Sequence, residues 1–315
     1  MSKKVLIIGL GQDGTILKEI CTANSINHYV ISKLKVFKKD KKIFNIDFNG
    51  EAMGNFINEN LFDIVFYTSA LQIGNSIKDN SREKDFFNIN STVPYDILKV
   101  VSECQPKKSI KFYYFSSCYL FSPNEAINLE SSMVLNDPYK KSKFDFLKKV
   151  KSYEFNKNIS IQNIYLFPHD SPLKNSSFLK KIIQTVKEGK KMNIISNKNN
   201  QDIFIDCAYE LMFSIYTDAI KNNFNTGVDE KFLGGHNYFS LNDLINFLIK
   251  KYQNGSEVNS FFNISNSEID RYYLSTNLYK SSLQYEKIPG KVLWERMLLD
   301  KKSYIHAIQN NLFKT

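Results

Sequence analysis

Short apolar runs alternate with amphipathic stretches along the first half of the chain. The runs expected to form strands are Lys4–Gly9, His28–Ser32, Ile43–Phe48, Asp63–Ser69, Ile110–Ser116 and Ile159–Phe167. Between them, apolar residues recur at helical spacing, as in Val93–Cys104 and Ser142–Tyr153. Continuous apolar runs are typical of strands that are buried on both faces of a parallel sheet. The alternation therefore predicts an α/β fold with a doubly wound, Rossmann-type parallel sheet.

The alternation becomes looser after about residue 168. The expected elements of this later half are helices at Ser177–Gly189, Cys207–Lys221 and Ser240–Tyr252, and a short strand at Met192–Ser196. We therefore divide the chain into a Rossmann domain at residues 1–167 and a smaller part at residues 168–315. This smaller part is expected to be interleaved with the last strands of the sheet.

A glycine-rich loop lies directly between the first strand and the first helix. It reads Gly9-Leu10-Gly11-Gln12-Asp13-Gly14, a G-x-G-x-x-G pattern in the context that gives the pattern its meaning. The glycines allow a tight turn, a close approach of the backbone to a pyrophosphate, and tight packing of helix on strand. The sequence thus predicts an NAD(P) site whose contact residues are Gly9, Gly11, Gln12, Asp13, Gly14 and, at the end of a later strand, Ser69.

The end of the second strand bears on the choice between NAD and NADP. An acidic residue there would bind the ribose 2′-hydroxyl of NAD, but this chain has Ser32 and Lys33. These residues suit a 2′-phosphate better, so NADP is favoured, with NAD possible and Lys33 as a plain surface residue the alternative. Asp47 is a candidate for an adenine contact or, equally, a residue that caps a loop.

A second pattern predicts proton transfer. Tyr139 and Lys143 form Y-x-x-x-K, which places a phenol and an ammonium on one helical face, and Ser117 ends an earlier strand. A nearby cation is expected to lower the pKa of the phenol, so that it exchanges a proton with a sugar hydroxyl. Ser117 would hold the same oxygen. Asn90 is expected to tie loops together rather than to contact a substrate.

Together these motifs make the chain resemble extended short-chain dehydrogenases/reductases of the nucleotide-sugar epimerase/dehydratase group. The closer resemblance is to the GDP-mannose 4,6-dehydratase family, on Gly11–Gly14, on Pro168-His169-Asp170-Ser171-Pro172, and on Phe178 with Lys181-Ile182. The resemblance implies NAD(P)-dependent chemistry at C4 of a nucleotide-linked sugar, with a GDP-sugar favoured. It also implies a homodimer formed through two helices.

The departures from that family bear on the reaction. Tyr119 stands where the family has the glutamate that eliminates water, which disfavours dehydration. We therefore favour a 4-keto-sugar reductase. The alternatives are a 4,6-dehydratase or 4-epimerase that recycles its bound cofactor, and a dinucleotide-binding sensor or partner subunit without catalysis.

Several further residues are candidates for the substrate side. The expected substrate contacts are His169, Lys174, Tyr119 and Arg271. His169 could instead order its loop, and Tyr119 could simply pack. Cys118 adjoins Ser117 and is a candidate catalytic group, although an inert buried thiol is the more frequent role of such a cysteine.

Composition disfavours binding to nucleic acids or membranes and structural roles for cysteine. The formal net charge is +10, but the basic residues are almost all lysine and are spread along the chain, which disfavours a nucleic-acid partner. Neither a run of about 18 apolar residues nor a signal peptide is present, so we expect a cytoplasmic protein that does not bind membranes. The four scattered cysteines predict neither a disulfide framework nor a metal site.

Overall fold

The structure is a computed structural model of the chain. It describes residues 3–32, 42–46, 51–71, 82–105, 107–128, 130–153, 158–171, 178–196, 202–204, 206–221, 225–235, 238–253, 262–266, 273–274, 295, 303 and 306. Four residues with a predicted role in the site lie outside this description, and they are Lys33, Asp47, Lys174 and Arg271.

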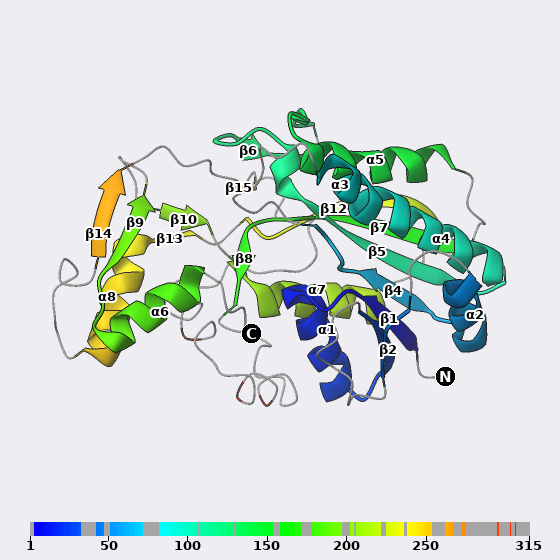
Figure 1. Ribbon diagram of the computed structural model, residues 1–315, viewed down its shortest axis with the longest axis horizontal. Helices are drawn as coiled ribbons and strands as arrows, with labels where there is room; N and C mark the ends of the chain where they lie inside the picture. Colours follow the sequence, from blue (N-terminus) through cyan, green and yellow to red (C-terminus); the bar gives the residue numbers. More distant parts are fainter. Residues whose placement is uncertain are drawn as a thin grey trace.

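Within the described residues, seven parallel strands form the central sheet (Figure 1), in the order β12-β7-β5-β4-β1-β2-β3. The strands are β1 Lys4–Ile8, β2 Asn27–Ile31, β3 Ile43–Phe44, β4 Ile64–Tyr67, β5 Ile110–Ser117, β7 Ile159–Leu166 and β12 Gly227–Leu233. The strand order reverses between β1 and β4, which is where ligands bind in open sheets of this kind. This confirms the predicted Rossmann-type α/β fold.

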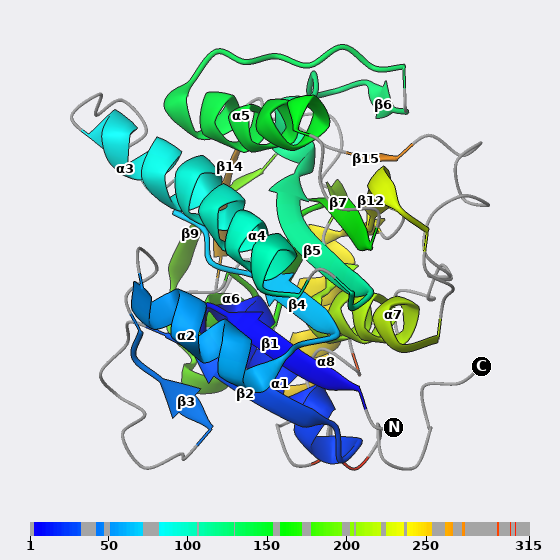
Figure 2. The same cartoon turned by 90° about the vertical axis from the view of Figure 1, so that its right-hand side faces the viewer.

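Helices cover both faces of the sheet (Figure 2). One face carries α1 Gln12–Ala23 and α7 Ala208–Lys221, and the other carries α2 Glu51–Asn60, α4 Val93–Cys104 and α5 Pro138–Ser152. The alternation of side chains along β1 explains the two layers, because Val5 and Ile7 join the core under α1 and α7. Leu6 and Ile8 join the core under α2, α4 and α5.

The later half of the chain contributes to two places. β12 and α7 belong to the sheet and its cover, whereas other elements lie at the opposite end of the molecule (Figure 1). Those elements are α6 Phe178–Glu188, α8 Leu241–Tyr252, and the strand pairs β9 Met192–Ser196 with β14 Phe262–Asn266 and β10 Asp202–Phe204 with β13 Tyr238–Ser240.

Several short elements complete the described structure. They are α3 Glu83–Phe87, the π-helix Asn88–Thr92, the 3-10 helix Cys118–Leu120, and the pairs β6 Ala126–Ile127 with β15 Tyr273–Leu274 and β8 His169–Asp170 with β11 Asp206–Cys207. Among the described residues, no helix is long and apolar enough to cross a membrane.

The differences from the predicted elements have local causes. The third strand ends at Phe44 rather than at Phe48, and α5 starts at Pro138, four residues before the predicted Ser142. The start of α5 is rich in lysine and hides the apolar period, but Asp137 caps the helix and Pro138 fits its first turn. β12 was not predicted, because it is an edge strand whose exposed, charged residues break the apolar run.

Candidate functional site

The glycine loop has the local geometry that a dinucleotide site requires. Gly9 has φ +104°, and a Cβ atom there would lie 2.7 Å from the backbone nitrogen of Ser69. A Cβ atom on Gly14 would lie 2.0 Å from the carbonyl oxygen of Gly9. At Gly11, by contrast, a Cβ atom would meet nothing within 4 Å, so the backbone is open beside the start of α1. The loop therefore fits a pyrophosphate, which would accept N–H groups at this helix N-terminus.

Hydrogen bonds connect this loop to its neighbours. The Thr68 hydroxyl, just after β4, lies 3.0 Å from the carbonyl oxygen of Gly9. Asn90 is fully buried in the π-helix, where its Oδ1 accepts from the backbone N–H of Leu71 at 3.0 Å and its Nδ2 donates to the Ser142 hydroxyl at 3.1 Å. Ser142 in turn donates to the carbonyl oxygen of Tyr139 at 2.7 Å. Asn90 thus ties loops together, as predicted.

The three predicted catalytic residues meet at the end of β5. Ser117 is the last residue of β5, and Tyr139 and Lys143 lie one turn apart on α5. A hydrogen bond links the side chains of Tyr139 and Ser117. The ammonium of Lys143 donates to the carbonyl oxygen of Phe115 at 2.6 Å and lies 4.6 Å from the centre of the Tyr114 ring. These contacts hold the cation on the inner face of the helix.

Burial sets the protonation of this pair. It raises the pKa of Tyr139 to about 12, and the hydrogen bond with Ser117 opposes the rise. Burial lowers the pKa of Lys143 to about 7, against the influence of the Asp13 carboxylate. The expected lowering of the pKa of Tyr139 by Lys143 is therefore wrong for this structure. Burial disfavours the charged form of Lys143, so its influence on the phenol is weaker than that of an exposed cation.

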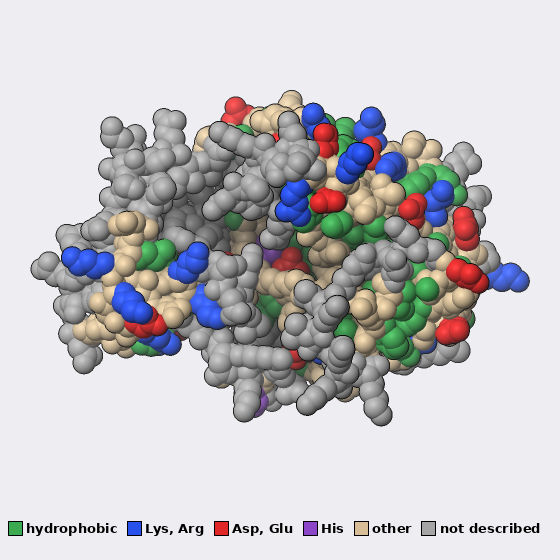
Figure 3. Space-filling model, in the orientation of Figure 1, with side chains coloured by type: hydrophobic (Ala, Val, Ile, Leu, Met, Phe, Trp, Pro, Cys, Tyr) green, Lys and Arg blue, Asp and Glu red, His purple; other side chains and the backbone are tan. Residues whose placement is uncertain are grey.

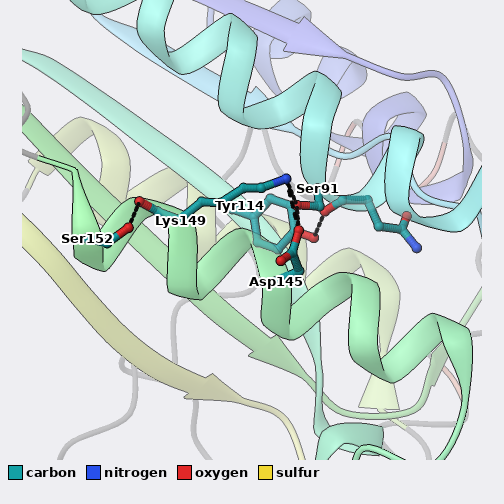
Figure 4. Close-up of polar contacts among 6 residues, drawn as sticks. Ser91, Tyr114, Asp145, Lys149 and Ser152 are labelled. Atoms are coloured by element: carbon teal, nitrogen blue, oxygen red, sulfur yellow. Dashed lines mark hydrogen bonds and ion pairs between the residues drawn. The ribbon is translucent and has the colours of Figure 1, made fainter. Parts of the chain in front are cut away.

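Other contacts fix α5, the helix that carries this pair, against the π-helix (Figure 4). The Ser91 hydroxyl donates to Asp145 Oδ2 at 2.6 Å, and Lys149 Nζ lies 2.9 Å from the same oxygen. Lys149 also donates to the Ser91 hydroxyl at 3.1 Å. Tyr114 donates to the carbonyl oxygen of Asn90. The Ser91, Asp145 and Lys149 side chains thus form one network that holds α5 against the π-helix.

The two residues after Ser117 differ in exposure. The side chain of Cys118 is packed in a small apolar cluster, the residue is 1% exposed, and burial raises the pKa of its thiol well above the usual value. This favours the inert thiol over the catalytic one. Tyr119 is 37% exposed, and its backbone N–H donates to the Ser117 hydroxyl at 3.2 Å. Tyr119 is thus partly exposed next to Ser117.

His169 contacts the glycine loop. Its Nε2 lies 2.9 Å from Asp13 Oδ1, and its Nδ1 lies 2.7 Å from the carbonyl oxygen of Phe167. Two residues further, the Ser171 hydroxyl lies 3.3 Å from Oε1 of Gln12. Both nitrogens of the His169 ring are engaged by protein, which favours the loop-ordering role over the substrate contact. The space-filling view shows a hollow near the middle of the molecule, with a histidine and acidic side chains in it (Figure 3).

Two residues near His169 and Tyr139 were missed by the sequence analysis. Asp206 is 1% exposed and accepts from the backbone N–H of Gly235 at 2.6 Å, at the start of β11. Ser142 links Asn90 to Tyr139. No sequence pattern marks Asp206, whereas Ser142 lies inside the Y-x-x-x-K segment and could have been noticed there. Ser32 is buried, with its backbone N–H bonded to the carbonyl oxygen of Phe44 at 3.0 Å.

The residues of this site lie in a segment that matches a known protein family. The model described as the NAD dependent epimerase/dehydratase family matches residues 5–207, which include the glycine loop, Ser117, Tyr139 and Lys143. The chain belongs to this family. Members are enzymes that use a dinucleotide cofactor, and none of the known curated proteins matches the chain significantly.

In the part of the chain that the structure describes, no group of three or more His, Cys, Asp or Glu residues suits a metal ion.

Solved structures share the fold over nearly the whole chain. A mutant UDP-glucuronic acid 4-epimerase from Bacillus cereus, in complex with a fluorinated UDP-sugar and NAD, has TM-score 0.73 and 15% identity, covering 98% of this chain and 99% of its own. A UDP-N-acetylglucosamine 4-epimerase from Bacillus cereus has TM-score 0.70 and 13% identity, covering 100% and 98%. The NAD⁺ complex of WbmH from Bordetella bronchiseptica has TM-score 0.70 and 15% identity, covering 93% and 96%. At these identities the likeness concerns the fold.

Proposed function

We propose that the protein oxidises and reduces C4 of a nucleotide-linked sugar in an epimerase-type reaction, with a nicotinamide dinucleotide that stays bound. The observation that carries the proposal is the meeting of Ser117, Tyr139 and Lys143 at the end of β5, next to a glycine loop that fits a pyrophosphate. The family and the 4-epimerases of the same fold support this outcome over the keto-sugar reductase that we favoured from sequence.

The residues have separate roles in the proposed reaction. Tyr139 would take the proton from the C4 hydroxyl and later return it, while Ser117 holds the same oxygen by a hydrogen bond. When bound, the oxidised nicotinamide supplies the hydride acceptor and a positive charge that lowers the pKa of the nearby phenol. Lys143, buried under Tyr139, would bind the nicotinamide ribose and keep the phenol oriented.

The cofactor and the substrate side are part of the same proposal. Gly9, Gly11, Gln12, Asp13, Gly14 and Ser69 would hold the dinucleotide. We keep NADP as the preferred form, on the basis of Ser32 and Lys33, although the fold neighbours are NAD complexes. Tyr119, Lys174 and Arg271 would contact the nucleotide sugar, from a substrate part at residues 168–315, in a cytoplasmic homodimer.

One experiment tests the reaction. The purified protein is denatured and any released dinucleotide is quantified, and the native protein is incubated with UDP-, GDP-, CDP- and dTDP-linked hexoses without added cofactor. We expect conversion to the C4 epimer, seen by NMR. Tyr139→Phe should reduce the rate by at least about a hundredfold, because the phenol that transfers the proton is lost.

The control and the contrary results are equally specific. Tyr153→Phe removes a hydroxyl from an exposed tyrosine at the end of the same helix and should leave the rate unchanged. Stoichiometric loss of NADPH or NADH with a 4-keto sugar, and no epimer, would replace the epimerase with the reductase. Dinucleotide binding without any turnover, for all sugars tested, would support the sensor instead.

A further inference from the structure

Asp13 and His169 come from distant parts of the chain and form an ion pair beside the glycine loop. Asp13 lies in the first turn of α1, and His169 begins β8, just after the end of β7. The side chain of His169 is 14% exposed and that of Asp13 is 16% exposed. The carboxylate of Asp13 and the carbonyl of Phe167 are both acceptors, at 2.9 and 2.7 Å from the two ring nitrogens. A ring that donates to both carries two N–H groups and a positive charge.

A second contact joins the same two segments. Gln12, the neighbour of Asp13, accepts from the hydroxyl of Ser171, two residues beyond His169. The segment is also tied to β11, because the backbone N–H of Asp206 donates to the carbonyl oxygen of Pro168 at 2.9 Å. Gln12 and Asp13, the two residues between Gly11 and Gly14, are thus the ones that contact Ser171 and His169.

The charges around the pair explain why it is ionised. Asp13 from α1 and Asp206 from β11 both face His169. Burial opposes protonation of the ring, but the charge and hydrogen bond of Asp13, the carbonyl of Phe167 and the charge of Asp206 together raise the pKa of His169 to about 9. At neutral pH the pair is therefore imidazolium and carboxylate.

The Asp13 carboxylate also acts on the helix opposite. It raises the pKa of both Tyr139 and Lys143 on α5. A phenol with a higher pKa is ionised to a smaller extent near neutral pH, so less of the basic phenolate is present. A positive charge on His169, whose Nε2 lies 2.9 Å from Asp13 Oδ1, would oppose this field.

We propose that Asp13 and His169 are a positioning pair, which locks the glycine loop against the end of β7 and cancels the charge of Asp13 beside Tyr139 and Lys143. His169 then acts through Asp13 and has no need to contact the substrate. The kinetic part of this inference rests on the proposed function, whereas the part that concerns the loop does not.

The loop function is tested with Asp13→Asn, His169→Gln and the double variant, with Ser171→Ala as a neighbour that changes no charge. Urea unfolding and NADPH or NADH titration by fluorescence are measured at about pH 7. Each single variant should weaken dinucleotide binding roughly tenfold, and the double variant should lose no more than the worse single, because one interaction is removed in all three. Additive losses in both measurements would overturn the pairing.

The electrostatic function is tested by the pH profile of the epimerase rate. In His169→Gln the Asp13 carboxylate loses its counter-charge, so the limb that reports ionisation of Tyr139 should move up by roughly 0.5 pH unit or more. Adding Asp13→Asn to that variant should remove the shift, and Ser171→Ala should not produce it. A limb that stays in place in His169→Gln would overturn the electrostatic role. The double variant separates charge from packing, because removing the Asp13 carboxylate would not reverse a shift that is caused by lost packing.

The two proposals can fail separately. A wild-type protein that binds no dinucleotide and converts no sugar contradicts the proposed function. The urea series still decides whether Asp13 and His169 are coupled in that case. A wild-type protein that is active, with single variants that unfold at the wild-type midpoint and bind as tightly, contradicts the positioning pair alone.

Discussion

Gly11 and Gly14 belong to one loop but have opposite surroundings. A methyl group on Gly14 would lie 2.0 Å from the carbonyl oxygen of Gly9, whereas one on Gly11 would enter open space. We expect Gly14→Ala to lower the free energy of unfolding by roughly 3 kcal/mol or more, because the backbone of the loop must move. Gly11→Ala should lower it by only about 0.5–1 kcal/mol, because Gly11 has an ordinary negative φ at the helix N-cap, where alanine caps less well than glycine.

Dinucleotide binding should rank these two variants differently from stability. Gly11→Ala should weaken NADPH or NADH binding at least roughly tenfold, because its methyl group occupies the space a pyrophosphate would approach. Urea unfolding and fluorescence titration on the same preparations measure both quantities. Unchanged affinity in a stable Gly11→Ala protein would mean that the cofactor does not lie over this residue.

At this scale the sequence predicted what depends on local spacing. The glycine roles and the meeting of Ser117 with Tyr139 follow from a loop, a strand end and a helical period. The partner of His169 could not be predicted, because Asp13 is 156 residues away and only the fold brings them together. The prediction that the pKa of Tyr139 is lowered was wrong for the same reason, because this pKa depends on burial by residues from several elements.

Among the elements, α5 is the one whose start bears on catalysis. The Asp137 side chain accepts from the backbone N–H of Lys140 at 2.9 Å, and Tyr139 is the second residue of the helix. Asp137→Ala should lower the free energy of unfolding by about 1 kcal/mol and the turnover rate with it, because the turn that carries Tyr139 frays. Urea unfolding and the epimerase rate check this.

Asp137→Asn separates the cap from the charge at the same position. Asparagine caps a helix as well as aspartate does, so stability should stay near that of the wild type. The Asp137 carboxylate contributes to raising the pKa of Tyr139, so its removal should move the limb that reports ionisation of Tyr139 to lower pH. An asparagine variant as unstable as the alanine variant would show that the carboxylate charge, rather than the cap, supports α5.

The bounds of helices and strands were predictable only where local apolar spacing sets them. Helices with a clear apolar period, such as α4 at Val93–Cys104, were predicted to the residue. The start of α5 was missed because it is set by a cap and a proline, and β12 because an edge strand needs no continuous apolar run. Pairing of β12 with β7 depends on the finished sheet.

For the whole molecule, two basic side chains, one buried and one partly buried, give opposite pH dependence of stability. The folded pKa of His169 is raised from 6.5 to about 9, so its contribution is complete below about pH 6.5 and is lost as the pH rises to 9. The folded pKa of Lys143 is lowered from 10.5 to about 7, so burying it is most costly below pH 7 and the cost is relieved as the pH rises towards 10.5. Between about pH 7 and 9 the two slopes oppose each other, each at most about 1.4 kcal/mol per pH unit.

Removing either base should therefore expose the slope of the other. In urea unfolding at about pH 7, 8 and 9, the free energy of unfolding of His169→Gln should rise with pH, because only the Lys143 contribution remains. Lys143→Met should lose relative stability over the same range, and near pH 7 it should be more stable than the wild type by roughly 0.5–2 kcal/mol while being inactive. Parallel curves for both variants and the wild type would mean that neither base changes its proton occupancy on folding in this window. Opposite slopes of the free energy of unfolding would show that Lys143 destabilises the fold and His169 stabilises it. The proposed reaction needs the buried Lys143, and His169 holds the glycine loop.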